Sequence, residues 1–439
     1  MSDSVLRLGI CGVGTVGTAV LNILRTQQLS LKRRTGADLV VSHVGARSDR
    51  PGSDYGSAHI CRDVLDVARD PDVQVVVELI GGTSVAYDLV KLALEQGKHV
   101  VTANKALLAE RGDELVALAE RVGVHLKYEA SVAGGIPVIK TLREALAANS
   151  VTEVTGIING TGNFILSEMA SKGRAFQEVL DEAQTLGFAE ADPSFDIDGT
   201  DAAHKLVILA ALAFGMPLRG LSPSKEGIDQ IEPIDLENAK TMGYRIKHLG
   251  IARLRDQAVE LRVHPTLIPE SKPLAGVDGV LNAVMLKGDA MSELLLVGPG
   301  AGGSATASSV CADLTDLARA LSDSGAAPTA ALGVPSSCLQ VRAIVPPEEV
   351  SSAWYVRLRA QDRPGVMAHI TQLLSDVNIS IESLIQKPPR RGETDVAVTL
   401  LTDPATTRQI QQAIAEIRAL GEVSEAITLI RVETFDDQA

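Results

Sequence analysis

A glycine-rich turn at residues 12–17 limits the fold of this chain more than any other segment. It has the spacing Gly-x-Gly-x-x-Gly, directly follows an apolar run and opens a helical pattern. Such glycines allow a tight turn, a close approach of the backbone to a pyrophosphate and close helix packing, while the helix N-terminus supplies a positive field. The alternative is a strand-to-helix turn that binds nothing. We predict a dinucleotide site formed by Gly12, Val13, Gly14, Thr15, Val16 and Gly17.

Short β-branched runs alternate with helical patterns through the first 130 residues or so. Strands are expected at 6–10, 38–46, 73–80, 98–103 and 124–130, and helices at 15–25, 85–96 and 106–121. Nearly continuous Val/Ile strands that are joined by helices are typical of a parallel sheet covered on both faces. The sequence therefore predicts an α/β fold, with a Rossmann-type doubly wound parallel sheet over residues 1–133.

The pattern changes after the glycine-rich stretch 131–137, and two further domains are expected. Mixed helices and strands predict an α+β substrate domain at 134–322, whose last helix, 307–322, is expected to pack on the first domain. Residues 323–351 are rich in Ser, Ala, Gly and Pro and are predicted to form a linker. Residues 352–432 follow a βαββαβ order, which is typical of a ferredoxin-like unit.

Charge and cysteine content exclude several classes of function. The chain has 41 basic and 55 acidic residues and no long Lys/Arg run, so nucleic-acid binding is not expected. Its four cysteines are scattered, which favours reduced thiols over disulfides or a zinc site. The longest apolar run, 206–218, contains Gly215 and Pro217 and reads as a buried helix. We expect a cytoplasmic protein that does not bind membranes.

The end of the second strand bears on the choice of cofactor. An acidic residue there would bind the ribose diol of NAD, but this chain has Arg47 between Ala46 and Ser48. A guanidinium at this place can bind the 2′-phosphate of NADP. NADP(H) is therefore favoured, with NAD(H) as the alternative if Arg47 is only a solvated loop residue.

Two segments combine charged groups with helix starts. Lys105 follows Asn104 after the fourth strand, at the sheet edge where ligands bind, although a capping Asn and a surface lysine would look the same. Asp201 and Lys205 lie four residues apart on one helix face, where a plain intrahelical ion pair is the alternative. Five carboxylates lie within the eighteen residues 187–204, next to an apolar helix, and this favours a bound cationic ligand.

Several segments together resemble homoserine dehydrogenase with a C-terminal ACT domain. They are GICGVGTVG, LIGG, VTANKALLA, GGIPVI, NGTGNFIL, GFAEADPSFDIDGTDAAHKL and WYVRLRAQDRPGVMAHI. The resemblance implies reversible NAD(P)H-dependent reduction of L-aspartate 4-semialdehyde to L-homoserine, in threonine, methionine and isoleucine biosynthesis. It also implies a homodimer or homotetramer that assembles through the α+β domain.

The resemblance further implies a role for each matching residue. Lys205 matches the proton donor to the carbonyl oxygen, and Lys105 matches a lysine between nicotinamide and substrate. Substrate-binding carboxylates are implied at Glu190, Asp196 and Asp201. Cofactor contacts are implied at Lys105, Gly187, Glu190 and Gly302, besides the glycine turn and Arg47. A monovalent cation, usually sodium, is implied at Glu129, Val132, Gly134 and Ile136.

The C-terminal unit is expected to bind L-threonine as an effector, because ACT modules bind small amino acids. Its strand-to-helix turn, 361–365, exposes amides that suit a carboxylate, and Asn378 and Ser380 are expected to meet the same ligand from across the unit. The alternative is a plain dimerisation unit. Cutting the chain near Pro347 is expected to abolish threonine inhibition and retain activity.

Two other functions stay open at this point. One is another ACT-bearing NAD(P)-dependent dehydrogenase that acts on a different amino-acid aldehyde or keto acid. The other is a non-catalytic sensor of dinucleotides and amino acids, which would have no need of Lys205 and Asp201 beside a nicotinamide.

Overall fold

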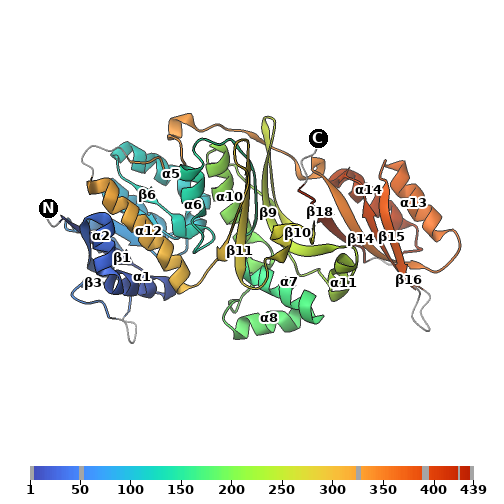
Figure 1. Ribbon diagram of the computed structural model, residues 1–439, viewed down its shortest axis with the longest axis horizontal. Coiled ribbons are helices and arrows are strands. Elements are labelled where there is room, and N and C mark those ends of the chain that lie inside the picture. Colours follow the sequence, from blue (N-terminus) through green and yellow to red (C-terminus); the bar gives the residue numbers. More distant parts are fainter. Residues whose placement is uncertain (1–3, 49–53, 323–327, 388–394, 424–425, 436–439) are drawn as a thin grey trace.

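The computed structural model describes residues 4–48, 54–322, 328–387, 395–423 and 426–435, and it is an elongated molecule of three units in a row (Figure 1). The first unit holds a six-stranded, wholly parallel sheet in the order β3-β2-β1-β4-β5-β6. This order defines a doubly wound dinucleotide-binding fold, as predicted. Its strands are β1 Ser4–Cys11, β2 Ala37–Gly45, β3 His59–Cys61, β4 Val75–Glu78, β5 His99–Thr102 and β6 Leu126–Lys127.

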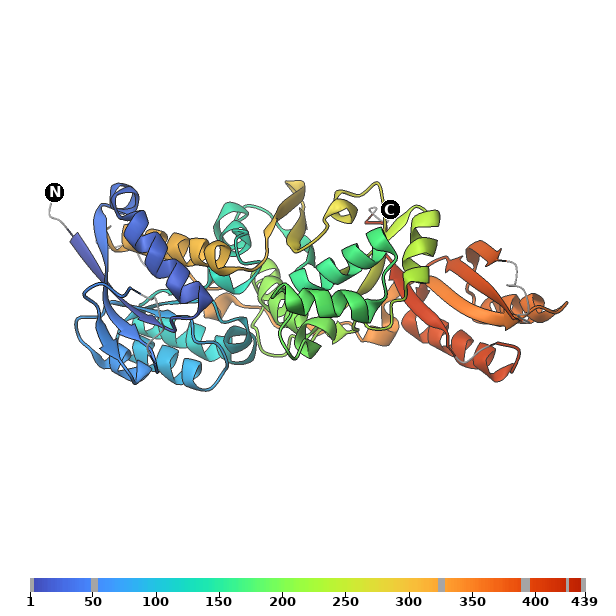
Figure 2. The same cartoon turned by 90° about the horizontal axis from the view of Figure 1, so that it is seen from below.

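Helices cover both faces of this sheet because neighbouring residues of its strands point to opposite sides, and apolar side chains dominate both sides. Val75 and Val77 pack against the α1 and α12 side, whereas Val76 packs against the side of α3, α4 and α5. The helices of the first sheet are α1 Thr15–Thr26, α2 Gln28–Thr35, α3 Val64–Arg69, α4 Val85–Glu95, α5 Lys105–Val122 and α12 Gly303–Ser322. The last of them returns from far along the chain to lie beside α1 (Figure 2).

The second unit contributes five long strands to a mixed sheet in the order β12-β11-β7-β9-β10. They are β7 Val151–Ile157, β9 Tyr244–Arg255, β10 Ala258–Pro269, β11 Leu281–Gly288 and β12 Ser292–Pro299. Its helices are α6 Val138–Lys140, α7 Gly160–Lys172, α8 Phe176–Thr185, α9 Ser194–Ile197, α10 Thr200–Phe214 and α11 Pro233–Thr241, and β8 Ser224–Lys225 pairs with β10. Helix α10 is apolar nearly all round because it packs between this sheet and α5.

The third unit has the predicted βαββαβ order. Its elements are β14 Ser351–Gln361, α13 Val366–Asp376, β15 Ile381–Lys387, β16 Asp395–Thr402, β17 Ala405–Thr406, α14 Thr407–Ala419 and β18 Thr428–Val432. Strand β18 pairs in parallel with β10, so the sheets of the second and third units are continuous. Figure 1 shows β10, β18 and β14 side by side at this junction.

Charged groups are buried along the β10–β18 junction. Glu433 accepts from Arg262 at 2.6 Å and from Arg253 at 3.1 Å, and the side chain of Arg262 is only 2% exposed. On the neighbouring face Asp235 of α11 binds Tyr355 and Arg357 of β14. The two units are therefore joined by hydrogen bonds, buried ion pairs and a shared apolar core.

The connecting residues 328–350 lie along the first and second units. Tyr128 donates to the carbonyl of Ala331 at 2.6 Å, and the amide of Gln340 donates to that of Gly215 at 2.8 Å. Strand β13, Ala343–Ile344, pairs with β10. No helix in the part of the chain described here is long and apolar enough to cross a membrane.

Three local predictions differ from the structure. Strand β3 and helix α3 were not predicted, because three residues of His-Ile-Cys carry little strand signal. The strand expected at 124–130 ends at Lys127 and gives way to a short 3-10 turn, because the amide of Glu129 donates to Asp313 on α12. The helix expected from 137 to 148 is α6 followed by a π-helical turn, Thr141–Ala145.

Candidate active site

A pocket of about 270 Å³ lies where the first two units meet, at the carboxyl ends of β4 and β5. Ligands of doubly wound sheets bind at this edge. The first unit lines the pocket with Val16, Glu78, Asn104 and Lys105 among others, and the second contributes Lys205 and Gly300. The pocket thus brings the glycine turn close to both predicted catalytic lysines.

The glycine turn has the geometry that a pyrophosphate needs. A Cβ on Gly12 would lie 2.4 Å from the carbonyl oxygen of Leu79, and one on Gly17 would lie 2.0 Å from that of Gly12. Nothing lies within 4 Å of the Cβ position of Gly14, so the space in front of α1 is open. The N-terminus of α1 has no side-chain cap and no acidic residue in its first turn. These features fit a dinucleotide whose phosphates bind the first amides of α1.

Glu78 supports the pocket and was not predicted from the sequence. It is fully buried at the end of β4, where one carboxylate oxygen accepts from the amides of Ile80 (2.8 Å) and Gly81 (3.1 Å). The other oxygen accepts from Thr102 Oγ1 at 2.5 Å. The carboxylate therefore holds the turn after β4 against β5. The sequence did contain a signal for this role: a Glu at the end of an apolar strand, shortly before two glycines.

Asp201 joins the two predicted lysines. Its Oδ1 lies 3.0 Å from Lys105 Nζ, and its Oδ2 lies 2.7 Å from Lys205 Nζ. Lys205 also donates to the carbonyl of Ile158 at 2.7 Å. The i,i+4 ion pair is therefore present, but its carboxylate is shared with a lysine from the other unit.

Asn104 does cap α5, since its side chain accepts from the amide of Leu107 at 3.1 Å. The cap starts the helix at Lys105, whose side chain crosses to Asp201 in the second unit. The predicted cap is therefore confirmed, and Lys105 lines the pocket, while its role there stays a prediction.

The electrostatics of this cluster favour a lysine that gives up its proton easily. Burial lowers the pKa of Lys205, and the positive charge of Lys105 lowers it further, although Asp201 opposes both. Burial disfavours the charge of Asp201, yet the two ammonium groups hold its pKa well below the usual range. At neutral pH Asp201 is ionised, and Lys205 is a stronger acid than an ordinary lysine.

Asn159 is a second site residue that was not predicted. Its Nδ2 donates to Asp196 Oδ1 and to Asp201 Oδ2, each at 2.8 Å. Burial and the charge of Asp201 raise the pKa of Asp196. The structure therefore brings Lys105, Lys205, Asp201 and Asp196 together around one asparagine.

Glu190 and Gly187 lie outside this contact network. Both are exposed after α8, and within the described residues the Glu190 carboxylate has no ion-pair partner. Their segment is tied to the site by Thr161 Oγ1, which donates to the carbonyl of Phe188 at 2.8 Å. Nothing in the contacts places Glu190 on the lysine cluster.

Arg47 lies beside the glycine turn. It follows β2, where the carbonyl of Gly45 accepts from the amide of Gly12 at 3.0 Å, and its side chain is exposed. Gly302, with a φ of +105°, precedes α12 close to the same turn, since a Cβ on the next residue, Gly303, would lie 3.0 Å from Thr15 Cγ2.

The predicted cation residues lie in the buried segment 129–136. The carboxylate of Glu129 accepts from the amides of Ile139 (2.9 Å) and Lys140 (2.8 Å), and burial together with Asp313 raises its pKa to about 7. The carbonyl of Gly134 accepts from Ser309 at 2.6 Å, and that of Ile136 from Val138 at 2.8 Å. Each carbonyl keeps a second lone pair. Among the described residues no group of three or more His, Cys, Asp or Glu side chains forms a metal site.

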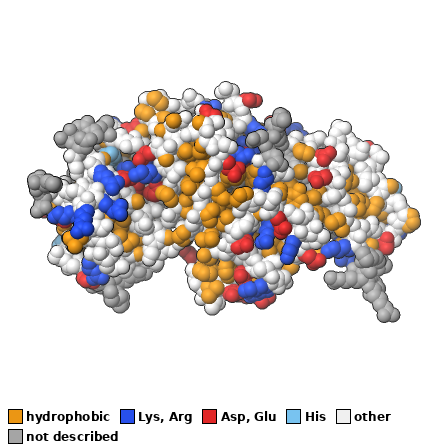
Figure 3. Space-filling view, viewed as in Figure 1, with side chains coloured by type: hydrophobic (Ala, Val, Ile, Leu, Met, Phe, Trp, Pro, Cys, Tyr) orange, Lys and Arg blue, Asp and Glu red, His pale blue; other side chains and the backbone are white. Residues whose placement is uncertain are grey.

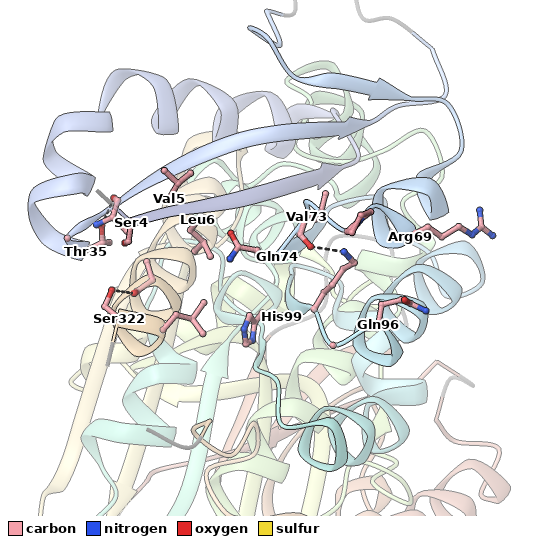
Figure 4. Close-up of a pocket in the computed structure, with 17 residues that line it drawn as sticks. Ser4, Val5, Leu6, Thr35, Arg69, Val73, Gln74, Gln96, His99 and Ser322 are labelled. Atoms are coloured by element: carbon pink, nitrogen blue, oxygen red, sulfur yellow. Dashed lines mark hydrogen bonds between the residues drawn. The ribbon is translucent and has the colours of Figure 1, made fainter. Parts of the chain in front are cut away.

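A second hollow lies at the opposite edge of the first sheet, at the amino ends of the strands (Figure 4). Lys98 lines it, but its ammonium donates to the carbonyl of Val73 at 2.6 Å, and Arg69 is paired with Asp66. Ser4 and Ser322, which line the hollow, border residues outside the described ranges. We assign no ligand to this hollow.

A dinucleotide turn that faces a buried lysine–aspartate–lysine cluster defines an NAD(P)-dependent oxidoreductase. Comparisons with known proteins give the family. Family models match the NAD-binding domain of homoserine dehydrogenase at residues 12–129, homoserine dehydrogenase at 137–315 and the ACT domain at 354–422. The chain belongs to the homoserine dehydrogenase family.

Individual relatives support the same assignment. A homoserine dehydrogenase of Pseudomonas aeruginosa is 49% identical, over 98% of this chain and 99% of the relative. A solved homoserine dehydrogenase of Thiobacillus denitrificans has a TM-score of 0.93 at 47% identity and covers 99% of both chains. A hyperthermophilic archaeal homoserine dehydrogenase in complex with NADPH has a TM-score of 0.60 at 28% identity, over 71% of this chain and 97% of its own. These relatives favour the enzyme over the sensor.

Proposed function

We propose that this chain reduces L-aspartate 4-semialdehyde to L-homoserine, and catalyses the reverse reaction, with Lys205 as the proton donor. The observation that carries the proposal is the buried Lys205 ammonium, held by Asp201 and the Ile158 carbonyl in the pocket beside the glycine turn. A bound nicotinamide would supply the hydride. Negative charge then builds on the carbonyl oxygen, where an acidic ammonium stabilises it and donates the proton.

We assign the remaining charges to holding the zwitterionic substrate. Glu190 and Asp201 would bind its ammonium, with Asp196 in support; Asp196 and Asp201 already lie inside the cluster, and Glu190 lies on the exposed segment beside it. Asp201 also balances Lys105 and Lys205. Lys105 comes from the dinucleotide fold, and we assign it to a place between the cofactor and the substrate.

The test is Lys205→Ala, with NADPH oxidation followed for L-aspartate 4-semialdehyde, succinic semialdehyde and a 2-keto acid. We expect the wild-type protein to prefer the first substrate. The variant should lose turnover by about 10²–10⁴-fold, as expected for a lost general acid, while NADPH affinity stays near wild type. Lys91→Ala, an exposed lysine on α4, is the matched control. Near-normal turnover of Lys205→Ala would refute the assignment.

We propose NADP(H) as the preferred cofactor, with NAD(H) as a poorer one. Arg47 supports this, because it is exposed beside the glycine turn, and residues 46–48, directly after β2, include no acidic residue to bind a free ribose diol. Gly187, Glu190 and Gly302 are assigned to cofactor contacts in the same proposal. Gly302 supports it because the next residue, Gly303, lies against Thr15 of α1.

We propose that Glu129 and the carbonyls of Val132, Gly134 and Ile136 hold a monovalent cation, with sodium as the first candidate. Burial and Asp313 raise the pKa of Glu129 to about 7, and a cation bound beside its carboxylate would stabilise the charged form. The melting temperature in NaCl should exceed that in choline chloride at equal ionic strength, and Glu129→Gln should remove the difference. Equal melting temperatures of the wild-type protein in the two salts would refute the cation site.

We propose that L-threonine inhibits the enzyme through the C-terminal unit. Gly365, with a φ of +97°, opens α13 without a side-chain cap, so amides at this turn are available to a carboxylate. Asn378 follows the other end of this 11-residue helix, about 16 Å away, so one small ligand cannot touch both within a single chain. A shared site needs the C-terminal units of two copies. Unchanged activity in millimolar threonine would reject the effector.

We propose a dimer formed through the second unit. Its edge strand β12 carries the half-buried Leu294, Leu295 and Leu296, and Val297 is 49% exposed. Apolar side chains also gather over the middle of the molecule (Figure 3). An unpaired edge strand of this kind invites pairing with another chain. Light scattering should give twice the chain mass, and Val297→Glu should lower it. A wild-type monomer would refute the proposal.

A further inference from the structure

Asn159 connects two helices and two carboxylates of the active site. It precedes α7, where its Oδ1 accepts from the amide of Gly162 at 2.7 Å. Its Nδ2 donates to Asp196 before α10 and to Asp201 on α10. Only 5% of the residue is exposed.

We propose that Asn159 is a positioning residue of the reaction, which keeps Asp201 and Asp196 apart as hydrogen-bond acceptors and thereby sets the charge that Lys205 experiences. The proposal goes beyond helix capping, because a cap needs only the Oδ1 contact. It rests on the proposed role of Lys205 as proton donor.

The orientation of the Asn159 amide is fixed by its partners. The Gly162 amide can only donate, so the atom that it meets must be the Asn159 oxygen. The NH₂ group must then face the two carboxylates. An NH₂ group can donate but cannot accept, so no proton can be shared between Asp196 and Asp201 through it.

This arrangement determines how much of the Asp201 negative charge acts on Lys205. Its Oδ2 accepts from both Asn159 and Lys205, and its Oδ1 faces Lys105. Each donor reduces the negative potential that remains for Lys205, and the adjacent Ile158 carbonyl binds the same ammonium. Residues 158 and 159 therefore hold the ammonium and its counter-ion at once. A change in the Asn159 amide should alter the proton affinity of Lys205 without touching it.

Two substitutions separate positioning from capping. Asn159→Ser and Asn159→Asp both keep a side chain that caps helices as well as asparagine does, so α7 should form in each. Serine loses the bridging NH₂ group, and aspartate also adds a negative charge beside Asp201. Asp63→Ser, at the remote cap of α3, is the matched control for exchanging a cap.

The measurement is the pH profile of kcat/KM for the semialdehyde in the full-length protein, together with the melting temperature and NADPH affinity. We expect at least a tenfold loss of kcat/KM for both Asn159 variants, with NADPH affinity within about twofold of wild type. Loss of the Asn159 NH₂ donor leaves more of the Asp201 negative charge to stabilise the Lys205 ammonium, which raises the pKa of Lys205. The alkaline limb of the pH profile should therefore move to higher pH. For Asn159→Asp the added charge should move it by about one pH unit. Asp63→Ser should leave the profile unchanged.

A purely structural cap would not change the ionisation of Lys205. If the alkaline limb of the pH profile is unshifted in both variants, the proposal is therefore overturned, whatever happens to activity and melting temperature. If the proposed function itself were wrong, Lys205→Ala would keep its turnover, and this result distinguishes the two failures.

Discussion

At the scale of single residues, the chemistry depends on Asp201 as the counter-ion of two lysines. In Asp201→Asn no carboxylate at this position opposes burial and the charge of Lys105, which both lower the pKa of Lys205. The pKa of Lys205 should fall further. Reduction requires its protonated form, so the alkaline limb of the reduction rate should move to lower pH, opposite to the Asn159 variants. An unchanged limb would mean that another group donates the proton.

Arg47 tests how the cofactor is selected. Arg47→Ala should weaken NADPH more than NADH, because a guanidinium–phosphate pair is a charge-assisted contact that NAD lacks. The affinities can be measured by fluorescence titration, with the exposed Arg33→Ala as a charge-matched control. Equal losses for both cofactors would show that Arg47 does not bind the 2′-phosphate.

Residue types explain which parts of the candidate site could be predicted from the sequence. Lysine and aspartate at helix starts attract attention because their charges are costly to bury, and Lys105, Asp196, Asp201 and Lys205 do form one cluster. Asn159 and Glu78 act through other residues. Nothing in a single sequence distinguishes an asparagine that only caps a helix from one that also binds two carboxylates.

At the scale of elements, the β10–β18 junction depends on Glu433. Although burial opposes its charge, Arg262 and Arg253 lower the pKa of Glu433. The ionised carboxylate therefore stabilises the folded protein, and this contribution should begin to be lost as the pH falls below about 4.3, the pKa of an unperturbed Glu. Glu433→Gln leaves the buried Arg262 with only the more distant carboxylate of Glu260, at 3.6 Å, and should cost up to about 3–5 kcal/mol in the free energy of unfolding, measured with denaturant. Glu349→Gln, from an exposed pair with Arg408, should cost less than about 1 kcal/mol. Equal costs for the two variants would contradict this account.

The elements themselves follow the periodicity of the sequence where that periodicity is long. Helix α5 and strand β1 lie within a few residues of their predicted ranges. The pairing of β18 with β10 could not be predicted, because it joins residues more than 160 positions apart through two register pairs. Periodicity shows which face of a strand is buried, but it does not identify the neighbouring strand.

At the scale of the whole molecule, the structure changes the expected effect of cutting near Pro347. Such a cut removes β18 and Glu433, and it uncovers Leu236, Ile246 and Leu267, which pack with the C-terminal unit. We now expect the truncated protein to melt at a lower temperature and to lose activity, as calorimetry and the NADPH assay would show. A truncated enzyme with full activity and an unchanged melting temperature would show that the continuous sheet has little energetic importance.

Helix α12 closes the first unit from a distant part of the chain. It packs over β2 and β5, and its last residue, Ser322, follows the end of β6 at Lys127 by 195 residues. During synthesis at ~5–20 residues per second, that face of the first sheet is covered by α1 but lacks α12 for roughly 10–40 s. Leu8, Val77 and Val101, fully buried in the finished protein, lie on this face. The nascent chain thus exposes an apolar surface for a time that allows a chaperone to bind it before the dinucleotide fold is complete.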